Sequence, residues 1–152
     1  MQTAKEMIEE KGSEIVCVPT GTTVHEALKK MNTYKVGAIL VTKDDKVVGI
    51  WTERDLMKNI LDAACDIKTT PIEQYMSCDL ITAPHTDTVY NLMDKFLGLR
   101  IRHLLIKQDG KYIGMVSAGD VMKASIQEKD SELKQLNSMV GWEYYENWKW
   151  KP

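Results

Sequence analysis

The chain has 152 residues, of which 43% are hydrophobic and 28% are charged, and its formal net charge is −2. This length suits one compact domain or two half-size units that share a core, and this composition excludes a disordered or fibrous chain. The near-neutral charge gives no global attraction to a phosphate backbone or an anionic bilayer, so we expect neither nucleic acid nor a membrane as a partner.

The start of the chain, residues 1–12, is rich in charge and has no apolar core of a secretory signal. No later stretch has the run of apolar residues that a membrane-spanning helix needs, so a cytoplasmic protein is expected. The three cysteines, Cys17, Cys65 and Cys78, form no Cys-x-x-Cys pair, and the three histidines stand singly. We therefore predict reduced thiols and no metal site.

A sequence repeat organises the chain. Residues 15–58 and 80–123 align without a gap at a shift of 65 residues. Identical pairs in this alignment include Thr23 and Thr88, Gly49 and Gly114, and Asp55 and Asp120. Such a register predicts two copies of one structural unit, at residues 1–65 and 66–126, followed by a separate segment at 127–152.

Each copy begins with a short strand and a proline turn, followed by a helix. Thr23 and Thr88 are the expected caps of the two helices, because a threonine hydroxyl accepts a hydrogen bond from a free N–H of the first turn. Apolar residues then recur at helical spacing, which indicates a helix lying on a sheet. These residues are Val24, Leu28 and Met31 in the first copy and Val89, Leu92, Met93 and Phe96 in the second.

Two strands and a second helix complete each copy. The strands are expected at 36–41 and 47–51, and again at 101–106 and 112–116, with a tight turn inside each pair. Asp109-Gly110 in the second turn is a strong hairpin signal. The second helices are predicted to start at Thr52 and Ser117, which makes the element order β-α-β-β-α in both copies.

The segment after residue 126 is expected to continue the last helix and to end in an aromatic tail. Ile126, Leu133, Leu136 and Val140 follow one side of such a helix. The tail contains Trp142, Tyr144, Tyr145, Trp148 and Trp150. So many aromatic residues are typical of a surface that becomes covered, either on the same chain or, as we prefer, on a second subunit.

One short motif occurs once in each copy. It reads GIWTERD at 49–55 and GMVSAGD at 114–120, that is, glycine, an apolar residue, any residue, Thr or Ser, two spacers and aspartate. With the repeated β-α-β-β-α order, the chain resembles the cystathionine β-synthase (CBS) domain family, and bacterial stand-alone CBS-pair proteins in particular. The resemblance implies an α/β (α+β) fold of two units packed pseudo-symmetrically as a Bateman module, with the C-terminal helix and aromatic tail added.

The resemblance also implies two ligand sites. In the family, the motif aspartate accepts hydrogen bonds from the ribose hydroxyls of an adenosine ligand, the Thr or Ser lies beside the ribose or phosphate, and a basic residue at the position of Arg102 reaches the phosphate. The first site is then expected to contain Val16, Cys17, Val18, Gly37, Thr52, Arg54 and Asp55. The second is expected to contain Ile81, Thr82, Ala83, Arg102, His103, Met115, Val116, Ser117 and Asp120. With Arg102 and His103, the second site is expected to prefer a charged nucleotide.

Structural roles compete with these assignments. Thr-x-x-Asp and Ser-x-x-Asp before a helix also form a capping arrangement that needs no ligand. Val16, Ala83 and the other apolar strand residues fit a plain core, and Arg102 fits a solvated strand edge. Gly49 and Gly114 permit either a close approach to the backbone or only a turn or bulge.

The expected function is regulatory. The ligand is predicted to be an adenosine compound, AMP first and ADP, ATP, NAD(H) or S-adenosylmethionine after it, with no required cofactor. Regulation would act in trans on an unidentified effector protein, and the chain is expected to form a homodimer. No nucleophile motif or phosphate-binding loop is present in the sequence, so we predict that it is not an enzyme. A ligand-free dimeric interaction scaffold is the alternative.

Overall fold

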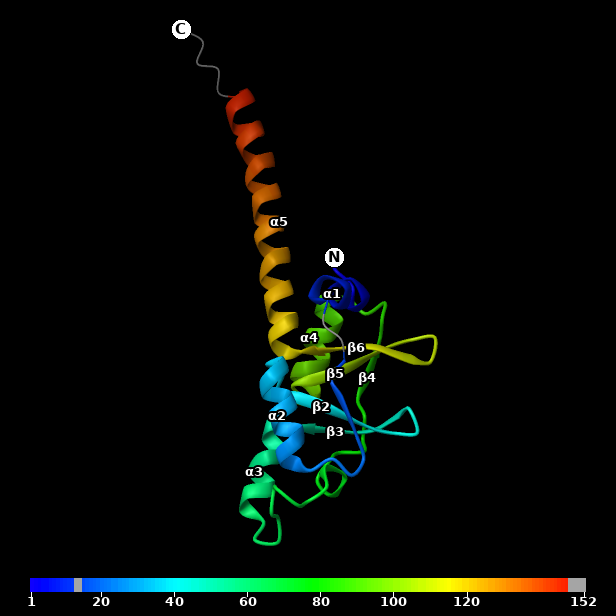
Figure 1. The fold of residues 1–152 in the computed structure, drawn as a ribbon. Coiled ribbons are helices and arrows are strands. Elements are labelled where there is room, and N and C mark those ends of the chain that lie inside the picture. Colours follow the sequence, from blue (N-terminus) through cyan, green and yellow to red (C-terminus); the bar gives the residue numbers. More distant parts are fainter. Residues whose placement is uncertain (13–14, 148–152) are drawn as a thin grey trace.

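Two copies of one β-α-β-β-α unit follow each other along the chain, as the repeat predicts (Figure 1). The first contains β1 (Cys17–Pro19), α2 (Val24–Tyr34), β2 (Ala38–Lys43), β3 (Lys46–Thr52) and α3 (Glu53–Leu61). The second contains β4 (Thr82–Pro84), α4 (Val89–Leu99), β5 (His103–Gln108), β6 (Lys111–Ser117) and α5 (Ala118–Asn147). The computed structural model describes residues 1–12 and 15–147, with side chains as far as residue 139.

Each unit has a three-stranded sheet of the same topology. β1 pairs in parallel with β2, which pairs antiparallel with β3, and β4, β5 and β6 repeat this arrangement. Asp44 and Asp45 have φ of 48° and 60°, and Asp109 and Gly110 have φ of 49° and 77°. Positive φ at both central residues matches the right-handed twist of a hairpin, so both predicted turns are confirmed.

The predicted caps and apolar stripes place α2 and α4 on their sheets. The Thr23 side chain accepts a hydrogen bond from the Glu26 N–H, and the Thr88 side chain accepts one from the Asn91 N–H. α2 buries Val24, Ala27 and Met31, and α4 buries Val89, Leu92 and Phe96. Each helix therefore covers the apolar face of its own unit's sheet.

The two units exchange their peripheral segments. α1 (Ala4–Lys11) precedes the first unit, yet Ala4 and Met7 are buried in the core of the second. The segment between the units contains the 3-10 turn Ile72–Gln74, and Ile72 is buried in the core of the first. The expected boundary at residue 65 divides the sequence, whereas the packing crosses it, because each core is closed by a segment from outside its own β-α-β-β-α unit.

The motif glycines are contact points for these exchanged segments. Gly49 and Gly114 lie inside β3 and β6, and a Cβ at either position would overlap with the side chain of Met76 or Ile8, respectively. The register of each hairpin also shifts next to these glycines, between Val41 and Thr42 and between Ile106 and Lys107. Both interpretations of the glycines, close approach and bulge, therefore apply here.

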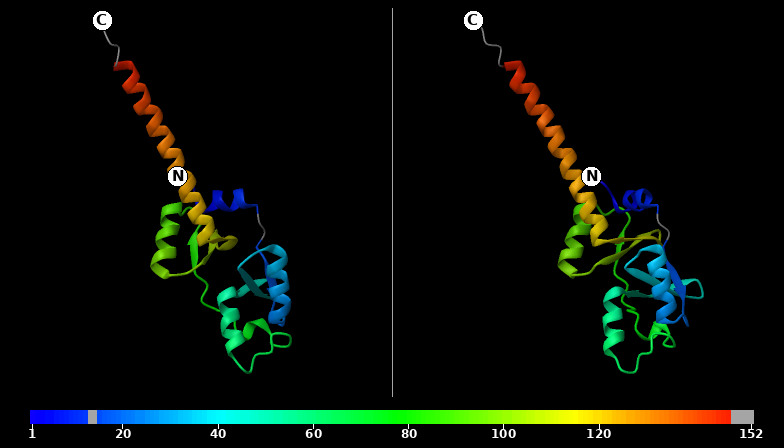
Figure 2. Two further views of the ribbon diagram at one scale, coloured as in Figure 1. Left: turned by 90° about the vertical axis from the view of Figure 1, so that its left-hand side faces the viewer. Right: turned by 60° about the vertical axis from the view of Figure 1, so that its left-hand side comes forward.

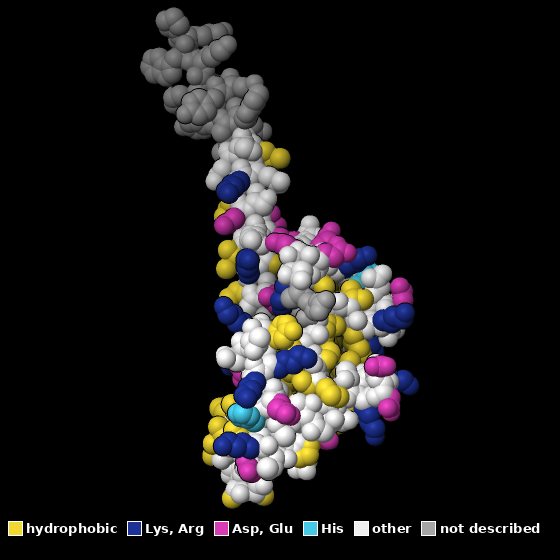
Figure 3. All heavy atoms as spheres, in the orientation of Figure 1, with side chains coloured by type: hydrophobic (Ala, Val, Ile, Leu, Met, Phe, Trp, Pro, Cys, Tyr) yellow, Lys and Arg dark blue, Asp and Glu magenta, His cyan; other side chains and the backbone are white. Residues whose placement is uncertain are grey.

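The last helix continues well beyond the second unit. α5 runs from Ala118 to Asn147, and Figures 1 and 2 show its C-terminal part extending away from both units. Met122, Ile126, Leu133 and Leu136 are exposed along it, and hydrophobic side chains are visible along this helix in Figure 3. The helix contains the backbone of the predicted tail residues 142–145, while Trp148 and Trp150 lie outside the described residues.

Candidate functional site

The first motif lies where β3 ends and α3 begins. Oδ2 of Asp55 accepts hydrogen bonds from the Thr52 N–H at 2.9 Å and from the Thr52 hydroxyl at 3.1 Å. Lys58 Nζ donates to Oδ1 at 3.4 Å. Asp55 is buried, and this capping arrangement fixes the direction of its carboxylate.

The second motif repeats this geometry at the start of α5. Oδ2 of Asp120 accepts from the Ser117 N–H and hydroxyl, both at 2.8 Å, and also from Lys11 Nζ at 2.9 Å. Partial burial alone would raise the pKa of Asp120, but these donors outweigh it and hold the pKa below its usual range. Asp120 is therefore ionised at neutral pH.

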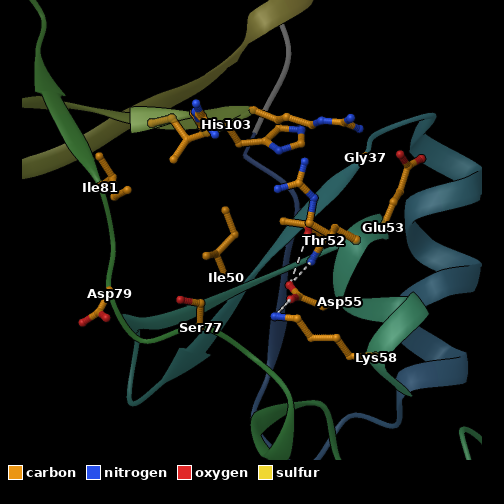
Figure 4. Close-up of a pocket in the computed structure, with 14 residues that line it drawn as sticks. Gly37, Ile50, Thr52, Glu53, Asp55, Lys58, Ser77, Asp79, Ile81 and His103 are labelled. Atoms are coloured by element: carbon orange, nitrogen blue, oxygen red, sulfur yellow. Dashed lines mark hydrogen bonds and ion pairs between the residues drawn. The ribbon is translucent and has the colours of Figure 1, made fainter. Parts of the chain in front are cut away.

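A cavity of about 270 Å³ opens beside the first motif, at the junction of the two units (Figure 4). From the first unit it is lined by Gly37, Thr52, Arg54 and Asp55, all predicted for the first site. From the other half of the chain it is lined by Ile81, Arg102 and His103, which the sequence had grouped with Asp120. The structure thus brings together residues expected in two separate sites.

Arg102 lies close to both motifs. The Ala118 N–H donates to the Arg102 carbonyl at 3.0 Å, just as the Glu53 N–H donates to the Gly37 carbonyl at 3.1 Å. The Arg102 backbone therefore lies beside the second motif, as the Gly37 backbone lies beside the first. Arg102 nevertheless lines the cavity of the first motif, as does His103 at the start of β5, because this end of β5 faces the first unit across the junction.

The charged side chains of this cavity favour an anionic ligand with one neutral polar part. Four of these side chains are cationic and three are acidic, and His103 also lines the cavity. The cations are Arg54, Lys58, Arg100 and Arg102, and the acids are Glu53, Asp55 and Asp79. Arginine forks match phosphate oxygens, while the fixed carboxylate of Asp55 is an acceptor for hydroxyl groups.

His103 and Gly37 face each other at one side of the cavity. A Cβ at Gly37 would lie 3.5 Å from His103 Nε2 and 3.4 Å from Glu53 Cδ, so the glycine keeps the space between them open. Burial is the main cause that lowers the pKa of His103, and the charges of Lys11 and Arg102 lower it further, against Glu53 and Asp120. The imidazole is therefore neutral at pH 7.

The remaining predicted residues lie in or next to the two cores. Val16 and Val18 are buried in the first core, and Ala83 and Val116 in the second. Cys17, Thr82 and Met115 are half-buried on the same strands, and burial raises the pKa of the Cys17 thiol. Among the described residues, none of these seven lines the cavity of Asp55, which agrees with the core interpretation.

A smaller cavity of about 110 Å³ lies beside Asp120. Its other walls come from α1 and the segment before it and from α5. They include Gln2, Met7, Glu10, Lys11, Lys123 and Gln127. The two motifs thus have unequal surroundings although their local geometry is the same.

Several cavity residues were missed by the sequence reasoning. They include Ile50, Glu53, Lys58, Ser77, Asp79 and Arg100. Two signals pointed to some of them: Lys58 is identical to Lys123 across the repeat, and Arg100 precedes Arg102 in a short basic run. Ser77 and Asp79 belong to the segment between the units, which has no counterpart in the aligned ranges.

Among residues 1–12 and 15–139, whose side chains the structure describes, no three His, Cys, Asp or Glu side chains gather in a way that would hold a metal ion. No helix there combines the length and the apolar character needed to cross a membrane.

Comparison with known proteins identifies the fold family. The profile of the CBS domain matches residues 6–62 and 72–127. The mitochondrial CBS domain-containing protein CBSX3 of Arabidopsis thaliana is 36% identical over 134 residues, which are 85% of this chain and 65% of that protein, so the chain spans about two thirds of this relative.

Solved structures agree with this match. A CBS-domain protein of Agrobacterium tumefaciens is 31% identical, with a TM-score of 0.76 over 82% of this chain and 99% of that one. Another CBS-domain structure, NE2398, is 36% identical, with a TM-score of 0.77 over 82% and 98% of the two chains. The repeated unit, the paired motif and these matches together show that the chain belongs to the CBS domain family, as a tandem pair of CBS units.

Proposed function

We propose that this chain is a regulatory module that binds an adenosine nucleotide, AMP first, in the cavity of Asp55. ADP, ATP, NAD(H) and S-adenosylmethionine are the further candidates, because all of them contain the same adenosine. CBS pairs are regulatory modules, and the ligand-dependent signal of this one would act in trans on an effector protein. Such a signal requires that the ligand binds two arrangements of the module with different affinity.

One observation carries the proposal: a buried, oriented carboxylate and four cationic side chains line the same cavity. Among the described residues, Oδ1 of Asp55 accepts from Lys58 at 3.4 Å, and the Lys58 side chain is exposed. Movement of this lysine into solvent would free the oxygen for a ribose hydroxyl. Arg102, Arg100 and Arg54 supply donors for a phosphate. Ile50 and Ile81 add apolar surface for a base.

Two structural neighbours support an adenosine ligand. A CBS domain protein of Pyrobaculum aerophilum was solved in complex with AMP, at 23% identity and a TM-score of 0.68. The CBS pair of another protein was solved with 5′-methylthioadenosine and S-adenosylmethionine, at 18% identity and a TM-score of 0.72. Both neighbours share the fold of this chain.

Calorimetric titration with AMP and with adenosine tests the site. Asp55→Ala should weaken the binding of both ligands by roughly ten- to a hundred-fold, because charge-assisted hydrogen bonds contribute about 1.5–3 kcal/mol. Arg102→Ala should weaken AMP binding and leave adenosine binding nearly unchanged. Lys46→Ala, at the start of β3, is the charge-matched control and should change neither. Equal losses for both ligands in Arg102→Ala would reject the phosphate assignment.

A ligand-free scaffold is the second candidate, because the Thr52 N–H and hydroxyl already use Asp55 as a helix cap. A thermal-shift series over adenosine compounds distinguishes the two functions. A ligand that binds only the folded state raises the melting temperature with its concentration. A melting temperature that stays constant up to millimolar AMP, ATP and S-adenosylmethionine would favour the scaffold.

We also propose that the chain forms a homodimer through the extended part of α5. Leu133 and Leu136 are more than half exposed on it, at 56% and 57%, and they follow Ile126 at helical spacing. A second copy of the same stripe would cover these side chains symmetrically. Light scattering of the intact chain measures the mass.

A further inference from the structure

Lys11 approaches the second motif from a firmly anchored helix. The Ala4 N–H donates to the Asp87 carbonyl at 2.7 Å, and the Lys5 N–H donates to the His85 carbonyl at 3.0 Å. Met7 is buried in the second core, and the Gln2 N–H donates to the Glu128 carboxylate on α5. α1 therefore holds the base of the Lys11 side chain in place beside Asp120.

The two motif carboxylates differ in what they still offer to a ligand. Oδ2 of Asp55 accepts two donors, both from Thr52, whereas Oδ2 of Asp120 accepts three, two from Ser117 and one from Lys11. A carboxylate oxygen has about two lone-pair sites, so the Thr52 and Ser117 donors already fill Oδ2 of both residues, and Lys11 adds a third, charged donor at Asp120. A ligand hydroxyl that approaches Oδ2 of Asp120 therefore has to displace the Lys11 ammonium, which has no counterpart at Oδ2 of Asp55.

The lysines paired with the two carboxylates also differ. Lys58 lies on the same helix as Asp55, its side chain is 72% exposed, and its contact is 3.4 Å long. Lys11 comes from a different part of the chain, its side chain is only 35% exposed, and its contact is 2.9 Å long. Lys58 can thus withdraw into solvent at small cost, whereas Lys11 loses a shorter and less hydrated ion pair.

We infer that Lys11 closes the second motif to nucleosides, so that the chain binds one adenosine ligand, at Asp55, although it carries two motifs. This inference rests on the proposed function and adds its stoichiometry. Lys11 contacts Asp120 from outside the second motif, whereas the contacts of the two carboxylates with Thr52 and Ser117 inside their motifs are alike.

Titration with adenosine in an Asp55→Ala background tests the inference, because that variant leaves Asp120 as the remaining motif carboxylate. Asp55→Ala should lose adenosine binding at least tenfold, and Asp55→Ala/Lys11→Met should regain it at least tenfold. Asp55→Ala/Lys5→Met is the control, since Lys5 lies on the same helix and, among the described residues, forms its ion pair with exposed Glu9, and it should regain nothing. Two ligands per chain in the wild type, or no recovery in the Lys11 double variant, would overturn the inference.

A ligand-free measurement separates this inference from the proposed function. Carboxyl NMR titration of the wild type and of Lys11→Met should show the Asp120 pKa rising when the ammonium is removed, with no change in Lys5→Met. An unchanged Asp120 pKa in Lys11→Met would show that the ion pair does not hold Asp120 and would reject the inference. Failure of the wild type to bind any adenosine compound would reject the proposed function instead, and with it the stated stoichiometry.

Discussion

At the scale of single residues, equivalent positions of the repeat have the same backbone role and different side-chain roles. The carbonyls of Gly37 and Arg102 both accept the first N–H of a motif helix. The side chain of Arg102, which Gly37 lacks, adds a cation to the cavity of Asp55. The asymmetry between the two sites therefore comes from a few side chains on two nearly identical backbones.

The lowered pKa of His103 predicts a pH-dependent stability. The unfolded chain binds a proton at this histidine first, at about pH 6.5, so the free energy of unfolding is fully retained above that pH and falls as the pH decreases through the lower native pKa. His103→Gln should remove this decrease in the free energy of unfolding, because glutamine does not titrate. Urea unfolding at pH 7.5 and pH 5 should therefore show a larger decrease in the wild type than in the variant, and equal decreases would contradict the prediction.

The contacts of the two motif glycines predict that replacing them by alanine lowers the free energy of unfolding by different amounts. In Gly114→Ala the new methyl group would lie 2.8 Å from Cγ2 of Ile8, a side chain that is stiff at its branched Cβ, and we expect a loss of about 1–3 kcal/mol. In Gly49→Ala the neighbour is the flexible Met76, so the loss should be smaller. A double-mutant cycle with Ile8→Ala checks the contact in urea unfolding. Additive free energies for Gly114→Ala and Ile8→Ala would show that the two residues do not touch.

At the scale of elements, α1 and the segment between the units each belong by packing to the other half of the chain. Isolated bridges mark both exchanges, Thr3 with Thr88 and Thr23 with Pro71. A short amphipathic helix has little stability alone, so α1 depends on the core that it covers. A destabilising substitution in α1 should therefore lower the stability of the second unit.

Met7→Ala tests this exchange. Removal of a buried methionine side chain should cost about 2–5 kcal/mol, and amide hydrogen exchange should accelerate in β4–β6 more than in β1–β3. Met31→Ala is the matched control, because Met31 is buried in the first core and should give the opposite pattern. Acceleration confined to β1–β3 in Met7→Ala would place α1 with the first unit.

At the scale of the whole molecule, the exposed stripe of α5 predicts how two chains associate. Leu133→Glu/Leu136→Glu should convert the proposed dimer into a monomer, because it would bury charge in an apolar contact. Truncation after Val140 should weaken the dimer as well if the aromatic tail takes part. Lys134→Glu, an exposed charge change between the two leucines, is the control. An unchanged mass in light scattering for both the double variant and the truncation would reject this interface.

The sequence alone determined the repeat, the β-α-β-β-α order, the capping threonines and the hairpin turns, because these follow from local spacing and from the conformations that Thr, Asp and Gly favour. It also identified Asp55 and Asp120 as equivalent carboxylates. Only the tertiary structure decided that Arg102 and His103 line the cavity of Asp55, that α1 closes the second core, and that Lys11 reaches Asp120 across 109 residues of sequence. The physical reason is that side-chain reach across the junction of two units depends on how the units face each other, and no local pattern encodes that orientation.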